Sequence, residues 1–367
     1  MKRRKFIGLA GTGLVVAGGL TYFLNEEYQN KSYRERATDI RKYSNYKNSG
    51  KLAMLELVRY ATLAANSHNT QPWLFKVETN KIIISPDFSR RCSAVDPDNH
   101  HLYASLGCAS ENIIHAAGAF GLKANISVNG DSDKEIQLDF EPASSIKSDL
   151  FQAIPKRQCT RGIYEGKKVS TKELNILESI AQDDGISTKL LTNETHLETI
   201  LEYVVEGNSA QMKDEAFMKE LKDWLRFNSS SVMKHGDGLY AASSGNPNLP
   251  SWLGNIMFDI VFKEKTENEK YRDHIRSSAG VIAFISEENN IESWIKSGRS
   301  YQRFALQATA LGLKHAFINQ AVEVPKVRKQ LAQYLNIGAR RTDLLIRFGY
   351  GKELPKSLRR PINDVII

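Results

Sequence analysis

Apolar residues recur with two different periods along the first part of the chain, and the periods predict an alternation of helices and strand pairs. From residue 52 to 65, and again from 102 to 122, they are spaced by three or four positions, which predicts two helices that each bury one face. The period changes after Pro72, where residues 73–77 and 81–85 predict a hairpin. Residues 124–128 and 135–140 predict a second hairpin. This order predicts an α+β fold.

One segment of the pattern is repeated later in the chain. Residues 105–126 can be laid over residues 296–317 at a constant offset of 191 residues, so that Gly107 falls on Gly298. Two unrelated amphipathic helices that end in Gly-Leu would also look alike. The flanks favour a true repeat, because strands predicted at 315–319 and 343–348 follow the second copy in the order seen in the first half.

The repeat predicts two halves of one fold. We expect the first half at residues 51–148 and the second at 149–367, enlarged by an insertion at about 200–270. The insertion contains a stretch rich in Gly, Ser and Asn, which suits a lid over a site.

Composition and charge narrow the class of protein. With 367 residues, 41% of them hydrophobic, the chain can bury one large core or two smaller ones. The net charge is +8, but Lys and Arg are interspersed with Asp and Glu rather than gathered in a block, which does not favour a nucleic-acid partner. Cys92, Cys108 and Cys159 show neither a CxxC pair nor a zinc-like spacing, so no metal site is indicated.

The N-terminus carries a targeting pattern. KRRKFI (residues 2–7) places two arginines before an apolar run, Phe6–Leu24, which resembles a twin-arginine export signal. The alternative is a membrane anchor, since the run is just long enough to span a bilayer. Both interpretations predict a periplasmic or extracytoplasmic, membrane-anchored protein. Residues 1–30 are assigned to this segment and the polar residues 31–50 to a linker.

The run NSHNTQPW (residues 66–73) is the most unusual chemistry in the chain. It lies between a predicted helix and a predicted strand, so we expect a loop at the end of a sheet, where ligand sites are often built. Asn and Gln side chains each donate and accept hydrogen bonds, which suits a heterocycle with alternating carbonyl and N–H groups, such as the pyrimidine edge of a flavin. The alternative is a polar helix cap followed by a turn.

Basic residues elsewhere suit a phosphate. Arg157 and Arg161 are four residues apart, so at the start of a helix they would share one face and bind an anion together with the free backbone N–H groups there. Arg359 and Arg360 add further positive charge just before Pro361. Each arginine alone is typical of a solvated surface charge.

These motifs together resemble the nitroreductase family of FMN oxidoreductases. ANSHNTQPWLF (65–75) is similar to the family's flavin-contacting loop, and PKRQCTRGIY (155–164) is similar to its phosphate motif, with Cys159 in place of the usual Ser. LLIRFGYGKELPKSLRRPINDVI (344–366) resembles the family's C-terminal end. With the repeat, the chain resembles the Acg-type branch, in which two nitroreductase-like halves are fused into a pseudo-dimer within one chain.

The resemblance implies one FMN site between the halves of a monomer. The family's loop and phosphate cations come from opposite subunits, and here the loop lies in the first half and the cations in or beside the second. The residues assigned to the cofactor are Ser67, His68, Asn69, Gln71, Arg157, Cys159, Arg161, Asn319, Gln320, Arg359 and Arg360.

The implied activity is reduction of a nitroaromatic or quinone-like acceptor by NAD(P)H through the flavin. Asn319 and Gln320 are placed near the reactive flavin nitrogen by the resemblance. No side chain stands out as a catalytic acid or base, and His68 is better suited to hydrogen bonding in the loop. Two alternatives remain: a non-catalytic protein that shields or stores FMN, and a membrane-attached interaction module without a cofactor.

Overall fold

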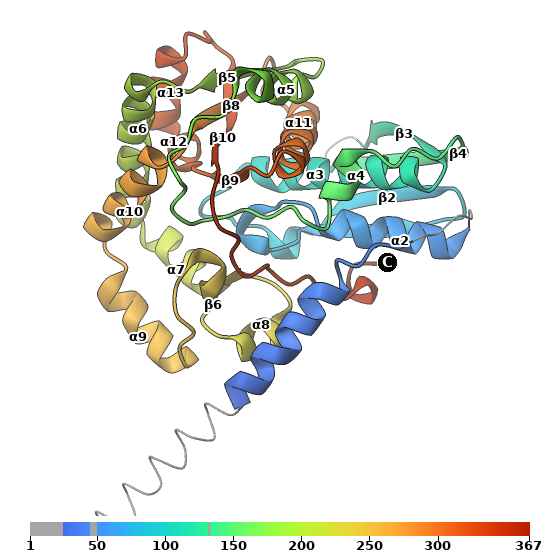
Figure 1. Ribbon diagram of the computed structural model, residues 1–367, viewed down its shortest axis with the longest axis horizontal. Helices are drawn as coiled ribbons and strands as arrows, with labels where there is room; N and C mark the ends of the chain where they lie inside the picture. Colours follow the sequence, from blue (N-terminus) through green and yellow to red (C-terminus); the bar gives the residue numbers. More distant parts are fainter. Residues whose placement is uncertain (1–24, 45–49, 131–132) are drawn as a thin grey trace, which may run out of the picture.

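The structure is a computed structural model that describes residues 25–44, 50–130 and 133–367. It consists of helices and mainly antiparallel strands, which confirms the predicted α+β class. Figure 1 shows two sheets, one formed by the first half of the chain and one by the second, with helices α3 and α11 between them.

The first half is one four-stranded antiparallel sheet and two helices. The strand order is β1-β2-β4-β3, and Trp73 pairs with Pro86 and Asn129 with Glu135, as the two predicted hairpins require. Its elements are α2 (Lys51–Thr62), β1 (Trp73–Val77), β2 (Lys81–Pro86), α3 (His100–Ala119), β3 (Leu122–Asn129) and β4 (Glu135–Pro142).

The second half repeats this strand order. Its antiparallel sheet has the order β5-β8-β10-β9, so in both halves the fourth strand along the chain lies between the second and the third. In both halves a 20-residue helix joins the second strand to the third. The sheet and its helices are α5 (Thr171–Ala181), β5 (Ile186–Leu191), α6 (Glu194–Met212), α10 (Glu264–Arg276), β8 (Gly280–Ser286), α11 (Ile291–Ala310), β9 (Lys314–Phe317), α12 (Gln320–Glu323), α13 (Pro325–Tyr334) and β10 (Arg341–Gly349).

Strands β8 and β10 are buried at every residue because helices cover both faces of this sheet. Alternate residues of β8 belong to different cores: Ile282 and Phe284 pack with α11 and the first half, whereas Val281 and Ala283 pack with α6 and α13. Such near-continuous apolar strands are expected of a sheet in the middle of three layers.

The remaining elements join the halves or form the predicted insertion. Helix α4 (Asp149–Ala153) begins the connection between the halves. The insertion, which we call the lid, comprises α7 (Glu215–Trp224), β6 (Leu225–Arg226), α8 (Ser229–His235), β7 (Leu239–Tyr240) and α9 (Ser251–Val261). It is shorter than the predicted range of about 200–270, because α6 and α10 belong to the helical layer of the second half.

Helices α3 and α11 cross at two glycines. A Cβ added to Gly107 would lie 2.1 Å from the carbonyl oxygen of Ile295, and one added to Gly298 would lie 1.9 Å from that of Ala104. Ala104 and Ile295 are separated by the same 191 residues as the two glycines. Each helix therefore contacts the other through equivalent residues of the repeat. The Cys108 thiol donates to Gly298 O over 3.2 Å across this contact.

A buried carboxylate joins the same two helices. Glu111 of α3 accepts hydrogen bonds from Arg299 (3.0 Å) and Arg303 (3.2 Å) of α11, and its other oxygen lies 3.2 Å from Nε2 of His115. Burial alone would raise the pKa of Glu111, but His115 and the two arginines outweigh it and lower the pKa to about 2. The carboxylate is therefore ionised at neutral pH.

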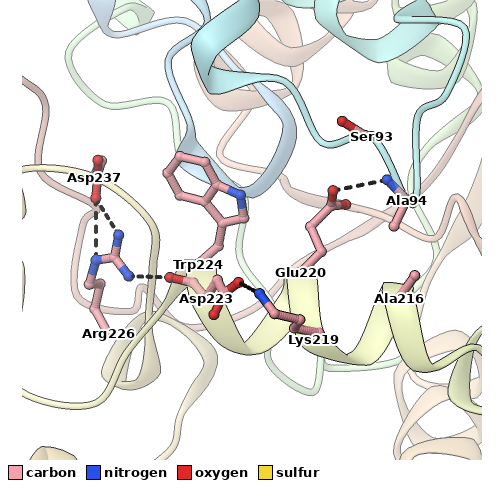
Figure 2. A pocket seen from close by; sticks show the side chains of 9 residues that line it. All are labelled: Ser93, Ala94, Ala216, Lys219, Glu220, Asp223, Trp224, Arg226 and Asp237. Carbon is pink, nitrogen blue, oxygen red and sulfur yellow. Dashed lines mark hydrogen bonds and ion pairs between the residues drawn. The ribbon is translucent and has the colours of Figure 1, made fainter.

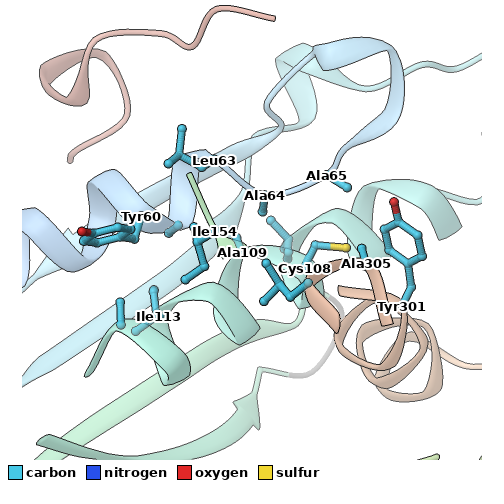
Figure 3. Close-up of a cluster of buried hydrophobic side chains, with 14 of the residues drawn as sticks. Tyr60, Leu63, Ala64, Ala65, Cys108, Ala109, Ile113, Ile154, Tyr301 and Ala305 are labelled. Carbon is cyan, nitrogen blue, oxygen red and sulfur yellow. The ribbon is translucent and has the colours of Figure 1, made fainter. Parts of the chain in front are cut away.

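One hydrophobic core runs across the junction. Figure 3 shows Ala64 and Ala65, just after α2, close to Cys108 of α3 and Tyr301 of α11. Side chains from both halves belong to this cluster, so the halves share a core instead of meeting at a polar interface.

The N-terminal region differs from the predicted linker. Residues 25–39 form a helix, whereas residues 31–50 were expected to be a linker. The helix is held because Tyr33 and Ala37 pack with Val232 and Leu358, two contacts that are distant in sequence. The predicted signal lies mostly in residues 1–24, outside the described residues. Among the helices that the structure describes, none is long and apolar enough to cross a membrane.

Gly107→Ala and Gly298→Ala should each lower the free energy of unfolding by about 3 kcal/mol or more, because overpacking usually costs about 1–3 kcal/mol and here the obstacle is backbone. Denaturant unfolding measures this. The control is Gly118→Ala on α3, whose added Cβ would meet nothing closer than 3.9 Å and should be neutral or stabilising. Equal stability of the Gly118 and Gly298 variants would contradict the close crossing.

Glu111→Gln should lower the free energy of unfolding near neutral pH by about 3–5 kcal/mol, the usual cost of removing one partner of a buried ion pair. The pKa of Glu111 is about 2 in the folded protein and about 4.3 in the unfolded chain. The wild type's extra free energy of unfolding is therefore fully present above a pH of about 4.3 and is lost as the pH falls toward 2.

Chemical unfolding between pH 2 and 7 tests this dependence. The control is Glu198→Gln, because the Glu198–Arg276 pair is exposed and such pairs contribute at most about 1 kcal/mol. A difference between wild type and Glu111→Gln that stays constant over this pH range would disprove the role of Glu111.

Candidate functional site

A cavity of about 550 Å³ lies where the two halves and the lid meet. This volume is in the range of about 300–1,000 Å³ that is usual for small-molecule sites. The halves supply most of its polar lining, which includes Asn66, Ser67, His68, His101, Arg161, Tyr271, Asn319, Gln320, Glu323 and Arg347. The lid supplies an apolar wall, which includes Phe217, Leu221, Leu225, Phe227, Met257, Phe258 and Val261.

The NSHNTQPW loop borders this cavity in a strained conformation. His68, Asn69 and Gln71 have φ angles of 44°, 54° and 56°, in the left-handed region that side-chain-bearing residues seldom adopt. Each such residue costs on the order of 1–3 kcal/mol unless the surroundings hold it. Because of this backbone path, Ser67 and His68 line the cavity while the next residues turn away from it.

Asn69 and Gln71 hold the loop in place. The Asn69 amide donates to Gly238 O (3.1 Å) in the lid and to Leu358 O (3.3 Å) in the C-terminal segment. Gln71 donates to Gly236 O (2.9 Å) and accepts from the backbone N–H of Arg360 (2.8 Å). Neither side chain is part of the cavity lining, so the structure gives both an anchoring role in place of the predicted direct contact.

Arg359 and Arg360 are also turned away from the cavity. Arg359 is buried and donates to Thr62 O and Ala64 O at the end of the α2 segment and to the Asn69 side chain (2.9 Å). A cation suits these carbonyls because the last turn of a helix leaves them unpaired. Arg360 donates to Gln71 O and Asp364 O. The structure therefore uses both arginines to fix the loop.

The Arg157 and Arg161 segment is extended and does not begin a helix, contrary to the expectation. It pairs with β9, where the backbone N–H of Thr160 donates to His315 O (2.9 Å) and Cys159 forms a bridge with His315. Arg161 lines the cavity, and in the described part of the chain no hydrogen bond or ion pair engages it. Arg157 is buried and donates to Leu63 O (3.0 Å), while its Nε and Nη1 have no partner.

Asn319 and Gln320 meet the cavity at the start of α12. Asn319 Oδ1 accepts from the backbone N–H of Leu345 (2.9 Å), which fixes this turn against β10. Gln320 donates to the hydroxyl of Tyr271, and its buried Oε1 accepts no hydrogen bond in the described protein. The amide oxygen of Gln320 is therefore available to a ligand.

An ion pair between the halves lines the cavity and was not foreseen. His101 of α3 lies 3.4 Å from Glu323 of α12, which also accepts from Gln211 (2.6 Å). Burial alone would lower the pKa of His101, but the hydrogen bond to Glu323 and the charges of Asp96 and Glu323 raise it. The contact with Glu323 therefore favours the charged form of His101 at the cavity wall. The adjacent pair His100-His101 was the only sequence signal for it.

The other cavity histidines are neutral. Burial lowers the pKa of His68 to about 4 and, together with Arg347, that of His274 to about 3. His68 Nδ1 lies 3.4 Å from the thiol of Cys92, and burial with Glu220 raises the pKa of that thiol. His68 therefore accepts a hydrogen bond from a protonated Cys92.

Two groups of metal-ligand types occur in the described chain: His68, Cys92 and Glu220, and Asp96, His100 and His101. Their carboxylates already accept backbone hydrogen bonds. Glu220 accepts from the N–H groups of Ala94 and Val95, and Asp96 from those of His101 and Leu102. These hydrogen bonds indicate that both groups stabilise the local backbone, so no metal ion is needed to explain them.

The lid is fastened to the first half by charged contacts. Figure 2 shows Glu220 of α7 pointing at the backbone N–H of Ala94 (2.9 Å) and Arg226 paired with Asp237 (2.7 Å). Asp237 also pairs with Arg90. The lid is therefore attached along α7 and at the loop that contains Asp237.

The fold is that of a two-sheet α+β protein with a cavity of small-molecule size between its halves. Comparison with known proteins finds two relatives described as "Putative NAD(P)H nitroreductase", from Mycobacterium tuberculosis strains CDC 1551 and H37Rv. Each is 23% identical over 320 residues, which covers 83% of this chain and 88% of the relative. These relatives confirm the resemblance to nitroreductases that the sequence motifs indicated. No protein-family model matches the chain.

Solved nitroreductase structures overlap part of the fold. The FMN-dependent nitroreductase NfnB from Mycobacterium smegmatis, in complex with NADPH, covers 59% of this chain and 96% of its own, at 10% identity and a TM-score of 0.39. A nitroreductase with bound FMN from Desulfitobacterium hafniense covers 60% and 98%, at 12% identity and a TM-score of 0.38.

Asn69→Ala should lower the free energy of unfolding by about 1–3 kcal/mol, because it removes the side-chain donor to the buried carbonyl of Gly238 and an acceptor of the buried Arg359. Limited proteolysis should also cut the lid faster. The control is Ser67→Ala, which changes the cavity wall and should leave the stability within about 0.5 kcal/mol. An Asn69→Ala protein as stable as the control would contradict the anchoring role.

Proposed function

We propose that the protein is an FMN-dependent oxidoreductase of the nitroreductase family and that the flavin binds in the cavity between the halves. The observation that carries the proposal is Arg161, a cation without a protein partner in the described chain, on the wall of a cavity that also receives the strained loop. The names of the two mycobacterial relatives support the same activity.

The residues present fit FMN. Arg161 supplies N–H donors and positive charge for a phosphate at the cavity wall, and Arg157, four residues earlier, does not line the cavity but adds buried positive charge to the same segment. The unpaired Oε1 of Gln320 would accept from a ring N–H, and Ser67 and Asn66 offer hydrogen-bonding groups on the loop side.

The chain's own residues would bind, orient and shield the cofactor. The anchored loop and α12 hold the polar groups in fixed positions, and the apolar lid excludes water from the cavity. The pair with Glu323 favours the protonated form of His101 at the cavity wall. FMN, when bound, supplies the two-electron chemistry.

The proposed donor is NAD(P)H and the proposed acceptor is a nitroaromatic or a quinone. With a quinone the overall reaction balances as NAD(P)H, one proton and quinone giving NAD(P)⁺ and hydroquinone. A nitro group would be reduced to a nitroso group and water, with consumption of NAD(P)H and one proton.

We also propose that the chain is an Acg-type fusion of two nitroreductase-like halves and works as a monomer. The shared strand order and the constant offset of 191 residues between the crossing helices support this proposal. One FMN per chain is expected, because the loop and Arg161 meet at one cavity.

Export and membrane attachment through residues 1–24 remain a proposal from the twin-arginine pattern. A cleavage assay in a host with and without the twin-arginine translocation machinery would test it.

A non-catalytic FMN-binding protein is the second candidate, because the lid is fastened at both Ala94 and Asn69 and shields the cavity. The absorbance spectrum of the purified protein should show about one FMN per chain. Stopped-flow bleaching of the flavin absorbance by NADPH then separates the two: rapid bleaching supports the enzyme, and absence of bleaching supports the flavin-shielding protein.

Arg161→Ala should weaken FMN binding by about 1.5–3 kcal/mol, roughly tenfold to a hundredfold in Kd, because it removes a charged contact to the phosphate. Riboflavin lacks the phosphate, so its affinity should hardly change. Titration of the apo-protein with each flavin, followed by fluorescence, measures both.

The control is Arg276→Ala, which removes an exposed arginine paired with Glu198 and should leave both affinities unchanged. Equal losses for FMN and riboflavin in Arg161→Ala would show that Arg161 does not contact the phosphate. A stoichiometry near two would contradict the single site.

A further inference from the structure

Helix α9 exposes an unusual amount of apolar surface. Of the eleven large hydrophobic side chains that are exposed in the described chain, five belong to this 11-residue helix. Trp252, Ile256 and Ile260 are 67%, 48% and 61% exposed, and their spacing of four residues places them in one stripe. A contiguous apolar stripe on a soluble surface usually marks an interaction site.

The inner side of the same helix covers the cavity. Gly254 and Phe258 are buried and line it. Met257 and Val261 line it too, yet they are 37% and 47% exposed. The apolar wall of the cavity is therefore continuous with the outer stripe of α9.

The outer stripe lies beside the start of the described chain. Glu26 of the N-terminal helix accepts from the backbone N–H of Ser229 (2.7 Å), and the neighbouring Asn228 donates to Ser251 (3.2 Å), the first residue of α9. Figure 1 shows that α9 and the beginning of the N-terminal helix both point to the side of the molecule opposite the sheets. The apolar run Phe6–Leu24 immediately precedes this helix in the sequence.

We propose that the outer stripe of α9 lies in the surface of a lipid bilayer and that the cavity receives a lipid-soluble quinone from it. The quinone part rests on the proposed function; the lipid contact does not. The apolar run at residues 6–24 argues for a bilayer as the occupant, because it is long enough to span one and is joined to the chain next to α9.

The charges of α9 suit this position. Asp259 is the only charged residue between 251 and 261, and Lys222 neutralises it at 2.8 Å. Trp252 at the start of the stripe is the residue type that favours the membrane–water interface. A quinone ring could enter along Met257 and Val261 while its hydrocarbon tail stays in the lipid.

The lipid contact is tested first, with the full-length FMN-loaded protein in vesicles of phosphatidylethanolamine and phosphatidylglycerol. Brominated lipids should quench the fluorescence of the wild type clearly more than that of Trp252→Phe, because Trp73 and Trp294 are buried and the half-buried Trp224 is common to both proteins. Equal quenching of the two proteins overturns the lipid contact. Cross-linking of Trp252→Cys between two copies would also overturn it, in favour of a dimer.

The substrate is tested with a long-tailed and a short, water-soluble quinone. Replacing Trp252, Ile256 and Ile260 together by Gln should lower kcat/KM for the long-tailed quinone about tenfold or more, because much of the buried apolar area is lost. None of the three lines the cavity, so the short quinone should react as before. The control, Ile146→Gln, changes an exposed Ile of the first half and should affect neither quinone.

The outcomes separate the two proposals. An equal fall for both quinones, or no fall for either, overturns the delivery of substrate from the membrane. Quenching of Trp252 in a protein that NADPH does not bleach would support the lipid contact while contradicting the catalytic function.

Discussion

The close crossing of α3 and α11 is the contact on which the rest of the structure depends. The two backbones can approach this closely only because Gly107 and Gly298 carry no side chains. The crossing merges the cores of the two halves and places Glu111 against the arginines of α11. It also builds part of the cavity, because residues of α3 and Tyr301 of α11 line it. A wider separation of the helices would change the core, the ion pairs and the site together.

Backbone strain in the loop at residues 66–73 is offset by hydrogen bonds from the loop side chains that point away from the cavity. Three left-handed residues in the loop would be unfavourable alone, yet Asn69, Gln71 and Arg359 fix them to the lid, the C-terminal segment and α2. The groups that face a ligand are thereby separated from the groups that hold the loop. This arrangement presents Ser67 and His68 rigidly and lowers the entropic cost of binding.

The cavity combines two chemistries that suit different parts of one reaction. The halves provide an unpaired cation, amides and a histidine paired with Glu323, which fit the proposed phosphorylated, heterocyclic cofactor. The lid provides an apolar wall, which fits a flat, poorly soluble acceptor. Helix α9 connects this wall to an exposed apolar stripe, so the proposed path of the acceptor and the proposed contact with a membrane depend on one element.

The sequence by itself determined the elements of the first half and the repeated helix of the second, because apolar periodicity reports directly which face of a helix or strand is buried. Both hairpins and the helices at Gly107 and Gly298 followed from it, and the loop and Arg161 were recognised by their chemistry. Only the tertiary structure decided where loop side chains point: because His68, Asn69 and Gln71 have left-handed backbone angles, neighbours along the chain diverge, so His68 faces the cavity while Asn69 binds the lid. Tertiary structure also brought Glu323 to His101 and turned residues 25–39 into a packed helix, because those contacts come from segments far apart in the chain.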